Sequence, residues 1–205
     1  MENRLLRAIF KPSKDQIWKR LCDEIGADFV DGGAWSGDRA QAHVGEWTIT
    51  LDTHIVAAGM SSATWTRMRA PFVNRDGFRF KIFREDLRSH MGKHLGLQDI
   101  ALGEAKLDRE FVIQGTDAGH VRLLLGHDAT RRLLECRSFA LLQVRDDEGL
   151  AGRAFPSGVD ELLFQVMGQE TEIARLKQMY EDFAATLNTL CHIGSAYEDD
   201  PHFAL

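Results

Sequence analysis

The first apolar residues of the chain recur with the period of a helix. Ser13 and Gln16 have the spacing of a capping box, in which each side chain satisfies a backbone N–H of the other residue. Ile17, Leu21 and Ile25 follow on one helical face, and Gly26 is a typical helix stop. The pattern predicts a first helix over residues 13–26.

The period then changes to the alternation of a half-buried strand. Alternating segments cover residues 47–55, 63–72 and 78–82, with shorter candidates at 28–32 and 40–45. Asn74 to Gly77 is a turn signal with Asp-Gly at its end. We expect an antiparallel meander in which residues 70–77 join two neighbouring strands as a hairpin.

Short elements fill the second half of the chain. Strands are predicted over 109–114, 139–144 and 161–166. Thr116 or Asp117 can cap a short helix that ends near Leu125, and Asp128 can cap a second that ends near Glu135. No element is assigned to 85–106, and residues 149–158 have the composition of a loop.

A closing helix shows the strongest periodicity in the chain. Its apolar residues repeat at spacings of three and four, and Gly194 ends the pattern; they are Ile173, Leu176, Tyr180, Phe183, Leu187 and Leu190. Such a seam packs against the core of its own domain or forms a homodimer contact between two helices. The spacing leaves both interpretations open, and core packing is the commoner one.

These elements predict an α+β fold, because strands cluster and helices cluster along the chain. We expect an antiparallel sheet of about seven strands packed by the first and last helices. Residues 1–194 would form a single domain, and residues 195–205 an acidic C-terminal tail. A sheet that curves around the long helix would enclose a cavity between them.

Charge changes this picture in one segment. The 205 residues carry a formal charge of −6, which argues against a dedicated nucleic-acid binder. Residues 67–93 nevertheless contain eight Lys and Arg and three acids, so this segment carries +5 and the remainder −11. This uneven distribution of charge indicates what the protein binds rather than how it folds.

Composition also limits the location of the protein. No window approaches 18 uncharged apolar residues, so no transmembrane segment is expected. Three widely spaced cysteines without a CxxC pair predict reduced thiols rather than a disulfide framework or a zinc site. We expect a cytoplasmic protein.

The most informative candidate site is a group of basic residues on two predicted strands. A period of two places Trp65, Arg67 and Arg69 on one face of their strand, and Arg79 and Lys81 on one face of the next. Like charges that face each other across a sheet are unfavourable unless acids interleave or an anion binds. The group is therefore either a binding site for an anionic small molecule or acidic protein partner, with Trp65 free to stack, or a solvated face neutralised by nearby acids.

Catalytic and metal motifs are weak by comparison. His90 and His94 have helical metal-ligand spacing but no third ligand and no adjacent Glu, so no metal site is predicted. Neither a nucleophile elbow nor a phosphate-binding glycine motif occurs, and no cofactor is expected. An enzyme would have to use dispersed residues, with His54, His90, His94 and Asp52 as the suspects.

Residues 108–148 carry a resemblance to known sequences. Asp108, Arg109 and Phe111 begin a strand that leads into a Leu-rich helix, and the segment resembles bacterial domains of unknown function. The resemblance implies a bacterial, non-catalytic module and assigns no catalytic residue.

Two functional hypotheses follow. The first is a soluble, non-catalytic binding domain that recognises an anionic ligand or acidic partner through the basic sheet face. The alternative is a hydrolase-like enzyme whose dispersed His and Asp residues lie beside the same basic residues. Nucleic-acid binding through these residues is a third, which the overall acidity opposes.

Overall fold

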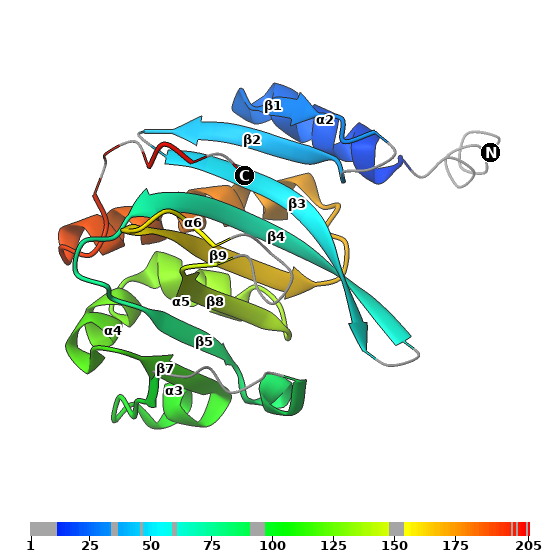
Figure 1. Ribbon diagram of the computed structural model, residues 1–205. Helices are drawn as coiled ribbons and strands as arrows, with labels where there is room; N and C mark the ends of the chain where they lie inside the picture. Colours follow the sequence, from blue (N-terminus) through cyan, green and yellow to red (C-terminus); the bar gives the residue numbers. More distant parts are fainter. Residues whose placement is uncertain are drawn as a thin grey trace.

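In the part of the chain that the structure describes, nine strands pair in one sheet, and every strand pairing is antiparallel. The computed structural model describes residues 12–33, 37–45, 47–58, 61–90, 97–147, 154–197, 199, 201–203 and 205, with the backbone alone at 57, 58, 61, 89 and 90. The helices α2, α5 and α6 lie behind the sheet in Figure 1, on one of its faces. The predicted α+β class is confirmed.

The described elements have the following bounds. The helices are α2 (Lys14–Ile25), α3 (Ala105–Glu110), α4 (Ala118–Leu125), α5 (Asp128–Glu135), α6 (Ile173–His192) and the 3-10 helix η1 (Glu85–His90). The strands are β1 (Asp28–Val30), β2 (Arg39–Val44), β3 (Trp47–Ala58), β4 (Ser61–Val73), β5 (Phe80–Arg84), β6 (Gln98–Asp99), β7 (Phe111–Gly115), β8 (Ala140–Arg145) and β9 (Val159–Met167).

The sheet order combines a local meander with long-range pairings. The strands run β1-β2-β3-β4-β9-β8-β5-β7-β6, so the first four are neighbours as predicted. The hairpin predicted through residues 70–77 is wrong, because β9 and β8 separate β4 from β5. The chain bends at residues 75 and 76, but this bend leads it away from β4 rather than back along it.

The first helix begins and ends where the sequence pattern indicates. Ser13 and Gln16 form both hydrogen bonds of the capping box, and Gly26 closes the helix at φ 68°, in the left-handed region that favours glycine. Trp18, which the predicted apolar stripe omitted, is fully buried. Its indole N–H donates to the Glu170 carbonyl over 3.3 Å and ties α2 to the start of α6.

The main core lies between the sheet and the helices α2, α5 and α6. Five of the six residues in the α6 seam are buried in this core, and Ile173 packs against it. The seam therefore serves the core of its own chain, and a homodimer contact through it has no exposed surface to use. No described helix is long and apolar enough to cross a membrane.

Candidate functional site

The face of the sheet opposite the helices carries the charged residues. Strand register aligns seven of its side chains in one row across seven strands: Gln114, Lys81, Gln143, Leu163, Arg69, Thr50 and Gln41. A second row beside it contains Val112, Phe83, Leu141, Gln165, Arg67 and Asp52. We call this surface the polar face.

Arg67 and Arg69 share the polar face of β4, as the alternation predicts, but an acid lies between them. Asp52 of β3 stands directly opposite Arg67. Its carboxylate accepts two hydrogen bonds from Arg67, at 2.7 and 2.8 Å, and one from Arg69 at 2.9 Å. This bidentate geometry neutralises much of the charge that the sequence places on β4.

A second acid lies in the strand that separates β4 from β8. Glu161 of β9 is 0% exposed, and its carboxylate lies 2.6 Å from the Arg145 guanidinium and 3.8 Å from that of Arg69. Burial raises the pKa of Glu161, while Arg145 and Arg69 act in the opposite direction. Sequence reasoning missed Arg145 and Glu161, because only the strand order brings them beside Arg69.

Arg79 lies at the end of the sheet rather than among the β4 cations. Its guanidinium pairs with Asp160 at 3.1 Å and with Asp146 at 2.7 Å. Asn74 also donates to Asp160, over 2.7 Å. The predicted grouping of Arg79 with Arg67 and Arg69 depended on the hairpin that the strand order excludes.

Lys81 differs from the arginines because it has no acidic partner. It is 3% exposed, and no described carboxylate forms an ion pair with its ammonium. Gln143 and Gln114 stand opposite it on β8 and β7, and its Nζ lies 5.5 Å from the centre of the Phe83 ring. Burial alone lowers the pKa of Lys81 from 10.5 to about 8. Two strands separate it from Arg69, so their strand axes are roughly 14 Å apart.

Trp65 does not form the exposed stacking platform that the sequence allowed. It is buried with Phe83, Leu87, Val112 and Leu141 in a second, smaller apolar cluster. Leu87 belongs to η1, so this cluster lies between the polar face and that short helix. Apolar side chains of this cluster therefore surround the Trp65 ring, which is 5% exposed.

Of the four residues in the enzyme hypothesis, the structure describes the side chains of Asp52 and His54. Asp52 is committed to two arginines. His54 lies one position further along the same face of β3; desolvation and the nearby Arg67 lower its pKa. The His90 side chain and His94 lie outside the described residues. The described part of the chain holds no group of three metal-ligating side chains.

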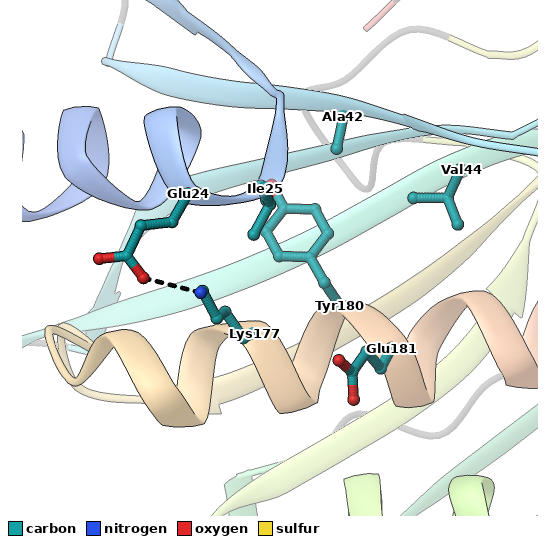
Figure 2. Close-up of a pocket in the computed structure, with 7 residues that line it drawn as sticks. All are labelled: Glu24, Ile25, Ala42, Val44, Lys177, Tyr180 and Glu181. Carbon is teal, nitrogen blue, oxygen red and sulfur yellow. Dashed lines mark ion pairs between the residues drawn. The ribbon is translucent and has the colours of Figure 1, made fainter.

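One shallow pocket lies at the edge of the helix layer. It has a volume of about 270 Å³ and lies between the end of α2, β2 and α6. Figure 2 shows its apolar floor, with the Tyr180 ring beside Ile25 and Ala42, and the Glu24–Lys177 ion pair of 2.7 Å at one side. Glu24 and Lys177 neutralise each other, and Glu181 adds a second acid to the lining.

A larger cavity lies on the polar face under the C-terminal residues. Its volume is about 360 Å³, and its walls are Gln41, Thr48, Thr50, Pro71, His202, Phe203 and Leu205. Phe203 packs edge-on against Phe155 from the β8–β9 connection, with ring centres 5.0 Å apart. Both segments lie in front of the sheet in Figure 1. The C-terminal tail thus covers the β2–β4 side of the polar face and leaves Lys81 on the other side.

Comparisons with known proteins support the fold and no more. No protein-family model matches the chain, and no curated protein sequence is significantly similar to it. The solved structure of the mycobacterial trehalose monomycolate transport factor A, TtfA, is similar over 87% of this chain and 97% of its own, with a TM-score of 0.52 and 8% identity. The resemblance of residues 108–148 to bacterial domains of unknown function stays a prediction.

Proposed function

We propose that this chain is a non-catalytic binding domain that receives an anionic group on its polar face at Lys81. The observation that supports this most directly is the isolation of the Lys81 ammonium. Arg67, Arg69 and Arg145 each lie against a carboxylate, whereas Lys81 is as buried as Arg69 and has none among the described residues. The cytoplasmic location is part of the proposal and agrees with three free cysteines.

Charge balance on the polar face supports an anionic ligand. At the centre of the polar face, Arg67, Arg69, Arg145 and Lys81 supply four positive charges, and Asp52 and Glu161 supply two negative ones. Two further acids stand at the ends of the same row: Asp28 opposite Gln41, and Asp99 opposite Gln114, from which it accepts a hydrogen bond. A buried charge without a partner is strongly unfavourable, and a bound anion provides the partner. The Gln143 carboxamide beside Lys81 has two N–H donors that suit a carboxylate or phosphate oxygen.

The test follows the Lys81 side chain directly. Protein labelled with ¹³C-lysine is titrated with sodium phosphate, sodium acetate and a hexaglutamate peptide, at constant ionic strength balanced with sodium chloride. We expect one of these probes to shift the Lys81 ε-carbon signal saturably and to raise the pKa of Lys81 from about 8. The effective probe distinguishes a phosphate, a simple carboxylate and an acidic peptide.

Two variants separate this site from general attraction to basic residues. Lys81→Met removes the buried charge and should abolish saturable binding. Lys106→Met removes a surface lysine that pairs with Glu135 at 3.2 Å, and should bind like the unmodified protein. A Lys81 signal that none of the probes affects, or equal binding by Lys81→Met, would contradict the proposal.

A further inference from the structure

The chain is anchored firmly where it leaves α6. Ser195 and Ala196 are buried, and Ala196 belongs to the main core. The Ser195 hydroxyl donates to the Asp76 carboxylate over 2.7 Å. The Tyr197 amide donates to the Val73 carbonyl over 3.2 Å. These contacts join the end of α6 to the chain that follows β4, so residues 195–197 are built into the domain.

The residues that follow Tyr197 differ from this anchor in their burial. We call the described ones the strap; they are Asp199, Pro201, His202, Phe203 and Leu205. None of these five is buried. Asp199 pairs with Arg75 at 2.7 Å, but both side chains are mostly exposed, and an exposed ion pair contributes little to stability. Burial thus falls sharply between the anchor and the strap.

Unfilled space separates part of the strap from the sheet. The cavity of about 360 Å³ on the polar face has His202, Phe203 and Leu205 as its outer wall and residues of β2, β3 and β4 as its inner wall. Thr50 on the inner wall is 1% exposed. Protein interiors are close-packed, and each gap removes dispersion contacts between the two sides. The strap therefore covers this part of the polar face without being packed tightly against it.

The backbone of the strap is strained at His202. Its φ is 49°, in the left-handed region that favours glycine. In the part of the chain that the structure describes, His202 is the one residue other than glycine with a positive φ. Strained backbone persists where surrounding contacts hold it, and it is common in segments that switch between two positions. Release of the strap would remove this strain.

We propose that the strap is an autoinhibitory cover, which lifts reversibly from the polar face while the anchor at Ser195 stays in place. The closed strap covers Gln41 and Thr50, the two residues at the β2 end of the polar row. Lifting adds both to the surface that a ligand can contact. A small anion at Lys81 does not require this step, because β9 and β8 separate Lys81 from the covered strands. A ligand that continues along the row to Gln41 does require it.

Thiol labelling measures the opening at the covered wall itself. Thr50→Cys places a thiol under the strap, and the bulky reagent fluorescein maleimide labels it when the strap lifts. Peptide mass spectrometry separates this product from that of the native Cys22, which is buried in the main core and reports unfolding of the whole domain. We expect the introduced thiol to react faster than Cys22 in the folded protein and more slowly than in urea-unfolded protein.

A second substitution weakens the strap without touching the cavity wall on the sheet. Phe203→Ala removes the edge-on contact with Phe155, and combined with Thr50→Cys it should speed labelling under the strap by about two- to tenfold. The rate at Cys22 should not change. Leu123→Ala is the control, because Leu123 is 56% exposed on α4, and it should leave both rates as they are.

Three results would overturn the proposal, and none depends on an anion at Lys81. An introduced thiol that reacts no faster than Cys22 opens only with the whole domain. One that reacts as fast as in urea is never covered. An unchanged rate in Phe203→Ala means that the strap is not the cover.

Chymotrypsin gives a measurement on the unmodified protein, which serves if Thr50→Cys does not fold. Cleavage after Phe203, followed by mass spectrometry, requires the strap to lift. We expect it to be faster in the folded protein than cleavage after Phe164, which is fully buried in the main core. Equal rates at the two sites would overturn the proposal.

Discussion

The two faces of the sheet are both buried, but by opposite means. On the helix-covered face, side chains such as Ile49, Met68 and Phe164 are fully buried among apolar neighbours. On the polar face, Asp52, Arg69, Lys81 and Glu161 are nearly as inaccessible. The apolar face needs only matching volume, whereas the polar face needs a specific opposite charge for each buried group. A residue that lacks its partner is therefore informative only on the polar face.

We expect the largest loss of stability from a variant that leaves a cavity in the core against the helix-covered face of the sheet. Phe164→Ala removes a ring at the centre of the sheet, where Met68 and Leu142 flank it on the adjacent strands. The free energy of unfolding should fall by about 3–5 kcal/mol, as for other Phe→Ala changes in cores. Urea denaturation measures this, and Leu123→Ala on the surface should change it by less than about 0.5 kcal/mol.

Removal of a charge from the polar face should lower the free energy of unfolding almost as much as Phe164→Ala. Asp52→Asn leaves Arg67 and Arg69 without their shared anion. We expect a loss of about 3 kcal/mol in the free energy of unfolding, at the lower end for a broken buried pair because Arg67 keeps some contact with water. Urea denaturation at low and high salt is the measurement.

An exposed ion pair is the matched control for Asp52. Asp199 pairs with Arg75 at 2.7 Å, and both side chains are mostly exposed. Asp199→Asn should lower the free energy of unfolding by less than about 1 kcal/mol. Equal losses for the two Asp→Asn variants would show that the polar face is in effect a solvated surface.

The buried charge of Lys81 should destabilise the folded protein, whereas the charge of Asp52 stabilises it. Its pKa is about 8 in the folded protein and 10.5 ordinarily, so the unfolded chain binds more protons between these values. Stability of the unmodified protein should therefore rise with pH from 8 to 10.5, by at most about 3 kcal/mol from this group. Below pH 8 the unfavourable contribution of the buried ammonium is present in full.

Lys81→Met removes that contribution. At pH 7 the variant should be more stable than the unmodified protein. This difference in stability should shrink as the pH rises from 8 to 10.5. Thermal or urea unfolding at pH 7, 9 and 10.5 measures the difference at each value. A variant that is less stable at pH 7 would mean that an anionic partner of Lys81 is already part of the folded chain.

Much of the fold could be predicted from the sequence, because local signals determine it. Ser13 and Gly26 delimit α2, and the spacing from Ile173 to Leu190 identifies α6. The strand order beyond β4 could not be predicted, since β9 pairs with β4 through contacts between residues about ninety positions apart. No local pattern encodes that choice.

The candidate site was predictable only in part, for the same reason. Alternation correctly placed Arg67 and Arg69 on one face of β4. It could not show that Asp52 neutralises them, because the pairing of Asp52 with Arg67 depends on the length of the β3–β4 hairpin. Lys81 became distinctive only when the strand order placed β8 and β9 between it and the acid-paired arginines of β4.

The position of β9 has a consequence for the chain as it leaves the ribosome. β4 is complete by Val73, but its neighbour in the sheet is not made until residues 159–167 have been synthesised. Until then, β4 offers one open edge and an apolar face that α6, made later still, has not covered. The sheet can close only after β9 has been synthesised, and pairings between such distant residues fold slowly. A chaperone that holds the nascent chain would therefore find its substrate in the strands β1 to β4, which are made before β9.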